Sequence, residues 1–224
     1  MELHPLKIAE ALRTIPLFSC LSDVDLEELA QAAVIKTYPK NAFLFSEGDQ
    51  TDSLYVIFSG NVKAVIVDEQ GKEVILSMFG PGEYFGEVAL IDGNERSASI
   101  MTREPVQVLV LTRDGFREIL ARNPDFSINL LKGMVRRLRE SNKQIEGLAL
   151  MDVYARVARL LSHLACLRGG SMLIRERLTH QEIASMTGAS REMVSRILKE
   201  LMTGGYISIK KKIITINKPL PYAW

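Results

Sequence analysis

Short apolar runs of strand length recur through the first half of the chain, from Tyr38 to Leu111. They are rich in β-branched and aromatic residues, and glycine-containing turns such as residues 80–82 separate them, which is typical of short β-strands. No helical pattern alternates with these runs, so a doubly wound parallel sheet is disfavoured. The pattern predicts an antiparallel sandwich or barrel. The predicted strands are Leu54–Phe58, Val62–Val67, Val74–Met78 and Val106–Val110.

A long helix is predicted after this β-rich part. Asn123 can cap it, and Pro124 suits its first position, where a missing N–H costs nothing. Its apolar residues recur at alternating steps of three and four, as in a coiled-coil seam, with one polar interruption. The seam positions are Leu131, Met134, Leu138, Ser141, Ile145 and Leu148. Because the stripe is narrow and the other faces are polar, we predict a helix paired in a homodimer; a single helix lying on its own domain is the alternative.

The sequence pattern in the last third of the chain predicts a helix-turn-helix. Residues 179–182 (Thr-His-Gln-Glu) form a capping box at the start of the first helix, and Gly188 ends that helix. Ser190 can cap the second helix, which has one apolar face. Before this pair, Asp152 can cap an amphipathic helix that is expected to run from Val153 to Leu167. Two helices joined by a glycine-containing turn are typical of DNA-binding domains.

The outer face of the second helix carries the candidate base contacts Arg191, Glu192 and Arg196. Arginine can donate two hydrogen bonds to guanine, and glutamate can accept one from the cytosine amino group. Beyond this helix, two short strands flank Lys210–Lys212, which predicts a wing whose lysines contact phosphates. A solvated turn is the simpler alternative for the lysines. These patterns predict DNA as a partner.

The composition is that of a globular chain, and the charge differs between the last third of the chain and the rest. The chain has 224 residues, 47% of them hydrophobic and 25% charged, which is enough apolar material for a core and suggests two domains. From residue 152 onward, twelve Lys and Arg stand against five Asp and Glu, for a net charge of +7, while residues 1–151 carry −6. A basic third favours a polyanionic partner, although a chance excess of solvated lysines would look the same.

Several classes of protein are disfavoured. No apolar run approaches the roughly 18 residues of a membrane span and the first twelve residues do not resemble a secretion signal, so no membrane partner is expected and the cytoplasm is the expected location. Cys20 and Cys166 lie 146 positions apart, which disfavours a disulfide framework, a paired-cysteine zinc site and an iron–sulfur cluster. No catalytic motif is evident, so neither enzymatic activity nor a metal or cofactor is expected.

Residues 85–98 (Phe-Gly-Glu-Val-Ala-Leu-Ile-Asp-Gly-Asn-Glu-Arg-Ser-Ala) contain the most informative candidate site. Gly86 permits a close approach of the backbone to a ligand. Arg96 can clamp a phosphate through charge-assisted hydrogen bonds, and Glu87 can accept hydrogen bonds from sugar hydroxyls. Taken singly, each residue has a simpler interpretation: Gly86 in a bulge, Glu87 and Arg96 in a salt bridge, and Ser97 in a turn.

This stretch closely resembles the phosphate-binding cassette of cyclic-nucleotide-binding domains, and residues 47–49 and 54–62 match that family's turn and strand. Together with residues 190–199, it makes the chain from Pro16 to Ile216 resemble bacterial transcription factors of the cyclic-AMP receptor protein (CRP/FNR) family. The resemblance implies an α+β fold. The implied parts are an N-terminal antiparallel β-roll at residues 1–122, a dimerisation helix and hinge at 123–151, and a C-terminal winged helix-turn-helix at 152–224.

The resemblance also implies where a cyclic nucleotide would bind, cyclic AMP being the favoured effector. Its phosphate is expected at Arg96 and Ser97, and its ribose 2′-hydroxyl at Glu87 and the Gly86 backbone. Cyclic GMP, cyclic-di-GMP, or an empty pocket with constitutive DNA binding are the alternatives. A nucleotide-sensing regulatory subunit of an enzyme is the alternative of another class.

The base of the nucleotide is expected at Ser141 and Asn142 of the long helix, one from each subunit. A hydroxyl at Ser141 on an otherwise apolar seam weakens a dimer, which favours a function such as contact with the ligand. A polar residue that only sets the register of the two helices is the alternative. The family's cyclic-AMP receptor has Thr-Ser at these positions, so the preference for adenine stays open. The junction from Leu148 to Asp152 is expected to couple the ligand to the DNA-binding domain.

For DNA, the resemblance places Arg191, Glu192 and Arg196 on base-reading positions and implies TGTGA-like half-sites in an inverted repeat. The expected phosphate contacts are Thr179 and Gln181, and the full set of expected DNA-binding residues is Thr179, Gln181, Ser190, Arg191, Glu192, Arg196 and Lys199. RNA polymerase is a candidate partner. Because the loop at 167–172 departs from the family's polymerase-contacting loop in length and residues, activation and repression both stay open.

Overall fold

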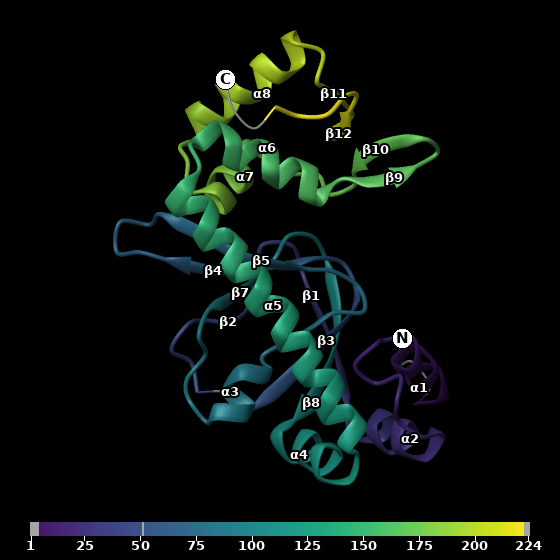
Figure 1. The fold of residues 1–224 in the computed structure, drawn as a ribbon. Coiled ribbons are helices and arrows are strands. Elements are labelled where there is room, and N and C mark those ends of the chain that lie inside the picture. Colours follow the sequence, from purple (N-terminus) through teal and green to yellow (C-terminus); the bar gives the residue numbers. More distant parts are fainter. Residues whose placement is uncertain (1–4, 51, 222–224) are drawn as a thin grey trace. The chain divides into compact units, whose positions relative to one another are not determined.

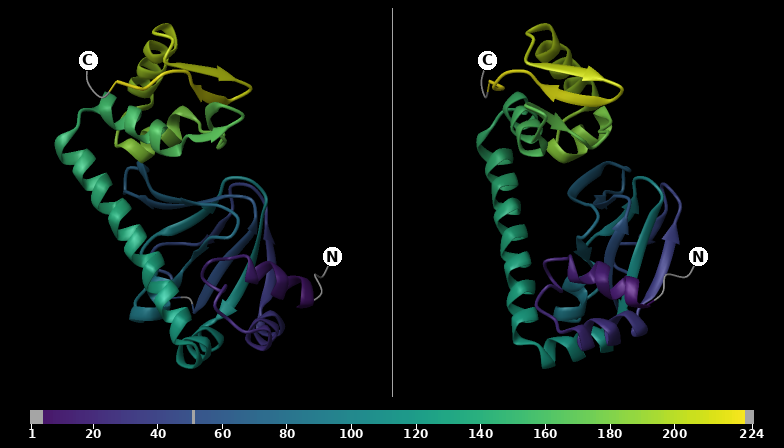
Figure 2. Two further views of the ribbon diagram at one scale, coloured as in Figure 1. Left: turned by 45° about the vertical axis from the view of Figure 1, so that its right-hand side comes forward. Right: turned by 90° about the vertical axis from the view of Figure 1, so that its right-hand side faces the viewer.

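The computed structural model describes residues 5–50 and 52–221, which form two compact units with their boundary in the chain between Leu138 and Arg139 (Figure 1). This boundary falls within α5 (Pro124–Leu150), which Figure 2 shows as one continuous helix. Among the described residues, no helix combines the length and the apolar character that a bilayer crossing requires.

The first unit contains the β-rich part that the strand pattern predicts. Its strands are β1 (Val34–Tyr38), β2 (Phe43–Phe45), β3 (Ser53–Ser59), β4 (Val62–Val67), β5 (Glu73–Phe79), β6 (Tyr84–Phe85), β7 (Ser99–Thr102) and β8 (Val106–Thr112). In the described chain they form two four-stranded sheets, with the orders β1-β8-β3-β6 and β2-β7-β4-β5. Every pairing within these sheets is antiparallel, so the antiparallel prediction is confirmed.

Side chains from both sheets share one hydrophobic core. Phe45, Val62 and Ile100 come from the β2-β7-β4-β5 sheet, and Ile57 and Val108 come from the other, all of them buried. Because successive residues of a strand point to opposite faces, a core shared in this way means that the two sheets pack face to face. The result is the roll that the resemblance implied.

Helices cover the outer face of the β1-β8-β3-β6 sheet. They are α1 (Pro5–Arg13), α2 (Asp23–Ala32), α4 (Arg113–Arg122) and the beginning of α5, while the short helix α3 (Glu87–Asp92) follows β6. Phe18, Leu26, Phe116 and Phe126 pack there with Leu109 of β8. The apolar pattern did not predict α1 to α4, because helices this short contain too few residues for a helical period to stand out.

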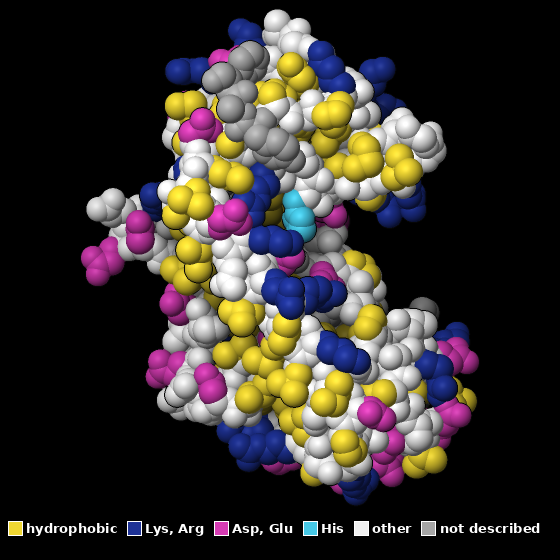
Figure 3. Space-filling model, viewed as in Figure 1, with side chains coloured by type: hydrophobic (Ala, Val, Ile, Leu, Met, Phe, Trp, Pro, Cys, Tyr) yellow, Lys and Arg dark blue, Asp and Glu magenta, His cyan; other side chains and the backbone are white. Residues whose placement is uncertain are grey.

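Helix α5 begins at Pro124, as expected, and buried Phe126 and Leu130 hold its first turns against the first unit. Farther along, large apolar side chains of the predicted seam are exposed, and Figure 3 shows hydrophobic side chains on this part of the surface. They are Leu131 at 55%, Leu138 at 60%, Ile145 at 64% and Leu148 at 56% of full exposure. A row of this kind usually marks an interaction surface.

The second unit contains a small α+β domain. Its elements are α6 (Val153–Leu164), β9 (Cys166–Arg168), β10 (Ser171–Ile174), α7 (His180–Thr187), α8 (Arg191–Thr203), β11 (Ile207–Lys210) and β12 (Ile213–Ile216). The strands form an antiparallel sheet in the order β11-β12-β10-β9. Val157, Ile183, Val194 and Leu201 from the three helices share its core.

One expected helix boundary was wrong. Helix α6 ends at Leu164 and not at Leu167, because residues 166–168 leave the helix and pair with β10. The turn between the two strands is formed by Gly169 and Gly170, with φ values of 53° and 79°. Glycine adopts such values at little cost, so the pair that was expected to stop a helix reverses a hairpin.

The expected pair of strands around the lysines is confirmed. Strands β11 and β12 pair from Ile207 to Lys210 on one side and from Ile213 to Ile216 on the other. Lys211 and Lys212 form the turn, with φ values of 51° and 66°. Two successive residues at positive φ are the requirement of the tight hairpin turn whose twist matches its strands. Both lysines are exposed at its tip.

Candidate functional site

The turn between β6 and α3 brings three of the expected ligand contacts together. Gly86 caps α3 with a φ of 88°, and a Cβ there would lie 2.8 Å from Arg96 Nη1 and 3.0 Å from the Ser53 carbonyl oxygen. A side chain at position 86 would therefore displace Arg96. The close approach that the glycine was expected to permit is, in this structure, the approach of the guanidinium to the backbone.

Arg96 is a buried cation held in a fixed position. Only 3% of the residue is exposed, and its guanidinium donates to the carbonyl oxygens of Gly86 at 2.7 Å and Ser53 at 2.8 Å. The guanidinium carbon lies 4.2 Å from the centre of the Phe45 ring. Burial lowers the pKa of Arg96, but the ordinary pKa of arginine is so high that the group stays protonated. A preorganised guanidinium of this kind can bind a phosphate.

The backbone around Arg96 is also fixed. Its N–H donates to the Asp49 carbonyl at 3.0 Å, and its carbonyl accepts from the Gly48 N–H at 2.9 Å. Ser97, the next residue, is exposed. The turn at residues 47–49, which belongs to the sequence resemblance, thus braces the segment that carries Arg96 and Ser97.

Glu87 is buried at 2% exposure, and its ion-pair partner was not predicted. Oε1 accepts from Arg137 Nη1 of α5 at 2.5 Å, while Oε2 is buried without a hydrogen-bond partner. Arg137 also donates to the Tyr84 carbonyl and stacks over the Phe79 ring. The helical pattern placed Arg137 only on a polar face, because 50 residues separate it from Glu87.

The remaining expected contacts lie farther along α5. Ser141 and Asn142 are exposed residues of this helix and belong to the second unit. The structure thus brings Gly86, Glu87 and Arg96 together within the first unit and leaves Ser141 of the seam and its neighbour Asn142 open to solvent. The free Oε2 of Glu87 and the Arg96 guanidinium provide an acceptor and a cation, the two groups that a ribose hydroxyl and a phosphate require.

Both helix caps of the helix-turn-helix are confirmed. Thr179 Oγ1 accepts from the Glu182 N–H at 3.1 Å, and Glu182 Oε2 accepts in return from the Thr179 N–H at 2.8 Å. Gly188 ends α7 with a φ of 63°. Ser190 Oγ accepts from the Met193 N–H at 3.2 Å and so starts α8. These local features fix where α7 begins and ends and where α8 begins.

Helix α8 presents one buried and one exposed face. Val194, Ile197, Leu198 and Leu201 are buried in the domain core. The exposed residues of this helix include all of its expected DNA contacts, Arg191, Glu192, Arg196 and Lys199, and Gln181 of α7 is exposed as well. A hydrogen bond of 2.6 Å between His180 Nδ1 and Ser195 Oγ, which was not predicted, joins α7 to α8. This face can enter the major groove of DNA.

Two family models match the chain. The model described as a cyclic nucleotide-binding domain matches residues 35–123, and the model described as a Crp-like helix-turn-helix domain matches residues 155–219. They cover the segments that carry the buried arginine and the exposed helix face.

Curated relatives match nearly the whole chain. The cAMP-activated global transcriptional regulator CRP of Pasteurella multocida is 35% identical over 200 residues, which cover 87% of this chain and 95% of the relative. The CRP-like cAMP-activated global transcriptional regulator of Mycobacterium tuberculosis is 35% identical over 184 residues, covering 80% of this chain and 82% of the relative.

Solved structures have the same fold. The catabolite activator protein of Thermus thermophilus matches with a TM-score of 0.54 and 33% identity, covering 90% of this chain and 93% of that one. The c-di-GMP responsive regulator CLP of Xanthomonas campestris matches with a TM-score of 0.74 and 24% identity, covering 88% and 100%. The two are similar to this chain in architecture, although their names associate them with different ligands or roles.

Proposed function

Because this chain belongs to the CRP/FNR family of transcription regulators, we propose that it acts as a homodimer whose binding to DNA is switched by cyclic AMP. Its cyclic-nucleotide-binding domain and its helix-turn-helix make it a transcription regulator, as its relatives are. We propose that it is located in the cytoplasm. The observation that carries the ligand proposal is the buried Arg96 guanidinium beside the unpaired Oε2 of Glu87.

The proposed nucleotide contacts follow from these groups. Arg96 and Ser97 bind the cyclic phosphate, and Glu87 with the Gly86 backbone binds the ribose 2′-hydroxyl. Burial of Arg96 strengthens the phosphate contact, because a charge-assisted hydrogen bond is stronger where water is excluded. Relatives named as cAMP-activated favour cyclic AMP, while the structural neighbour named as c-di-GMP responsive makes cyclic-di-GMP the competing ligand.

The proposed dimer contact is the exposed apolar row of α5. Leu131, Leu138, Ile145 and Leu148 are each more than half exposed and repeat with the spacing of a two-stranded seam. Pairing with the same row of a second copy would bury them. In that dimer Ser141 lies on the seam and Asn142 beside it, and we propose that they contact the base.

For DNA, we propose that Arg191, Glu192 and Arg196 read the bases of a TGTGA-like half-site. Thr179, Gln181, Ser190 and Lys199 would contact phosphates, together with the lysines at the wing tip. Two copies of α8 in a homodimer must enter successive major grooves, about 34–36 Å apart. An inverted repeat provides that spacing.

The proposed switch is the junction between α5 and α6. Arg159 of α6 donates to the Lys143 carbonyl of α5 at 2.9 Å, and Asp152 caps α6 by accepting from the Ala155 N–H at 2.7 Å. A ligand shifts a two-state equilibrium only by its differential affinity for the states, and couplings of about 1–3 kcal/mol are typical. A change in this junction would alter the spacing of the two α8 helices.

The experiment that tests the proposed function is a DNA titration. The protein is titrated into a labelled TGTGA palindrome and a scrambled duplex with cyclic AMP, cyclic GMP, cyclic-di-GMP or no addition, at a fixed salt concentration. We expect cyclic AMP to tighten binding to the palindrome by roughly 5–150-fold, the range of typical couplings. Equal binding under all four conditions would contradict gating, and a response to cyclic-di-GMP alone would replace the ligand.

A single substitution tests base reading. Arg191→Ala is expected to cost about 1–3 kcal/mol at the palindrome, because a bidentate contact with guanine is lost, and to relax the base preference at one position. The affinities for the palindrome and for duplexes changed at that position are compared by fluorescence anisotropy, with Arg168→Ala, an exposed arginine of β9, as the control. An equal loss on scrambled DNA would mean that Arg191 contacts phosphate and not a base.

A further inference from the structure

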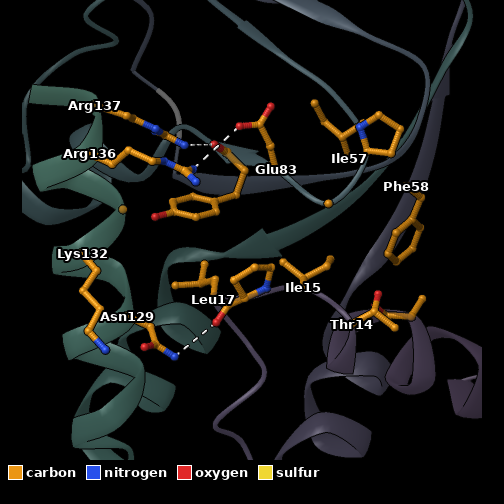
Figure 4. A pocket seen from close by; sticks show the side chains of 16 residues that line it. Thr14, Ile15, Leu17, Ile57, Phe58, Glu83, Asn129, Lys132, Arg136 and Arg137 are labelled. Carbon is orange, nitrogen blue, oxygen red and sulfur yellow. Dashed lines mark hydrogen bonds and ion pairs between the residues drawn. The ribbon is translucent and has the colours of Figure 1, made fainter. Parts of the chain in front are cut away.

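A cavity of about 690 Å³ lies in the first unit (Figure 4). Its walls are the segment at residues 11–17, the end of β3, the turn at residues 81–84 and one face of α5. Of the residues assigned to the nucleotide, none lines it. The volume falls within the range of about 300–1,000 Å³ that is typical of small-molecule sites.

The walls of this cavity differ in character. Lys132, Arg136 and Arg137 project from α5, whereas Ile15 and Phe58 lie across from them (Figure 4). Glu83 is the one carboxylate among the lining residues, and it lies 3.8 Å from Arg136 Nη2. Arg137 is already paired with Glu87, so Lys132 and Arg136 stand against Glu83 and leave one positive charge in excess. With the apolar side chains opposite, they make the cavity suitable for a molecule with an anionic end and an apolar body.

A buried hydroxyl points to a ligand independently of the charges. Tyr84 lines the cavity and is 7% exposed, and its hydroxyl is buried without a hydrogen-bond partner. Burial raises the pKa of Tyr84, so the hydroxyl stays protonated and can donate. A Cβ at Gly133 would overlap this hydroxyl. The helix thus carries a disfavoured glycine to admit a polar group that nothing in the described chain satisfies.

We propose that this cavity binds a small amphipathic anion. One carboxylate or phosphate group pairs with Lys132 and Arg136, an aromatic or aliphatic body packs on Ile15 and Phe58, and the Tyr84 hydroxyl donates a hydrogen bond to the ligand. The site goes beyond the proposed cyclic-nucleotide site. It adjoins that site through Arg137, which lines the cavity and holds Glu87.

The test is calorimetry on the full-length protein with three probes of the same ring system: 1-naphthyl phosphate, 1-naphthoate and the neutral 1-naphthalenemethanol. The two anions are expected to bind about tenfold more tightly than the alcohol, because a charge-assisted bond is stronger than a neutral one. Whichever anion binds more tightly identifies the headgroup. Equal binding of all three probes, or no binding at millimolar concentration, overturns the proposal.

Two variants locate the probe. Lys132→Gln is expected to weaken both anions about fivefold to tenfold and to leave the alcohol unchanged, whereas Lys40→Gln, at an exposed lysine outside the cavity, changes neither. Thr14→Trp fills the cavity from its rim and is expected to weaken all three probes, with Thr37→Trp as the matched control. Binding that neither Lys132→Gln nor Thr14→Trp alters overturns the proposal.

A third variant separates this site from the nucleotide site. Arg96→Ala is expected to retain full affinity for 1-naphthyl phosphate, because Arg96 is not among the lining residues. If this variant loses the probe, the probe occupies the nucleotide site and the second site is refuted. If it keeps both the probe and cyclic AMP, the proposed nucleotide contact is wrong and the second site stands.

Discussion

Replacing Arg96 by alanine is expected to weaken cyclic AMP binding at least a hundredfold and to remove the response of DNA binding to the nucleotide. The guanidinium is buried and held by the carbonyls of Gly86 and Ser53, so it offers a phosphate a cation that needs no reorganisation. Two hydrogen bonds to a charged group contribute about 1.5–3 kcal/mol each, and their joint loss exceeds roughly 3 kcal/mol. Isothermal titration with cyclic AMP measures the effect.

Two further variants make the Arg96 result specific. Arg96→Lys keeps the charge but loses the fork that donates to two acceptors, so an intermediate affinity is expected. Arg117→Ala, at an exposed arginine of α4, is expected to change nothing. Because Arg96 also satisfies two backbone carbonyls, thermal unfolding must show that each variant is folded. A folded Arg96→Ala protein with unaltered nucleotide affinity would disprove the proposed pocket.

Leu138→Asp is expected to split the dimer, raising its dissociation constant at least a hundredfold. Leu138 is 60% exposed in the single chain and lies at the middle of the apolar row. In a twofold dimer each protomer brings the substitution to the same contact, so two carboxylates lose their water in an apolar seam. The penalty is roughly several kcal/mol. Sedimentation velocity over a range of protein concentrations measures it.

The matched control is Leu167→Asp, at a leucine of β9 that is 71% exposed and lies outside the row. It removes a similar exposed apolar side chain and is expected to leave the protein dimeric. A dimeric Leu138→Asp variant would show that copies of this chain associate through another surface. In that case the placement of Ser141 and Asn142 beside a bound base would also fail.

The features that could be predicted are those whose residues lie close together in the chain. Thr179 and Ser190 each cap a helix by accepting from an N–H three residues away, so the residue types alone indicate the hydrogen bond. The strand from Val62 to Val67 has the expected bounds, because β-branched residues between two turns favour one local conformation. The predicted end of α6 was wrong because residues 166–168 pair with β10 instead of extending the helix, and their partners lie beyond the glycine turn.

The sequence by itself determines the features that depend on periodicity and on short motifs. These are the order of the two domains, the polar and apolar faces of α5 and α8, and the positions of Gly86 and Arg96. Only the tertiary structure decides that Glu87 pairs with Arg137 and that Tyr84 contacts Gly133. Each joins α5 to the segment at residues 84–87, about 50 residues earlier in the sequence. A period shows which face of a helix is polar, but which distant group meets that face depends on how the helix packs against the roll.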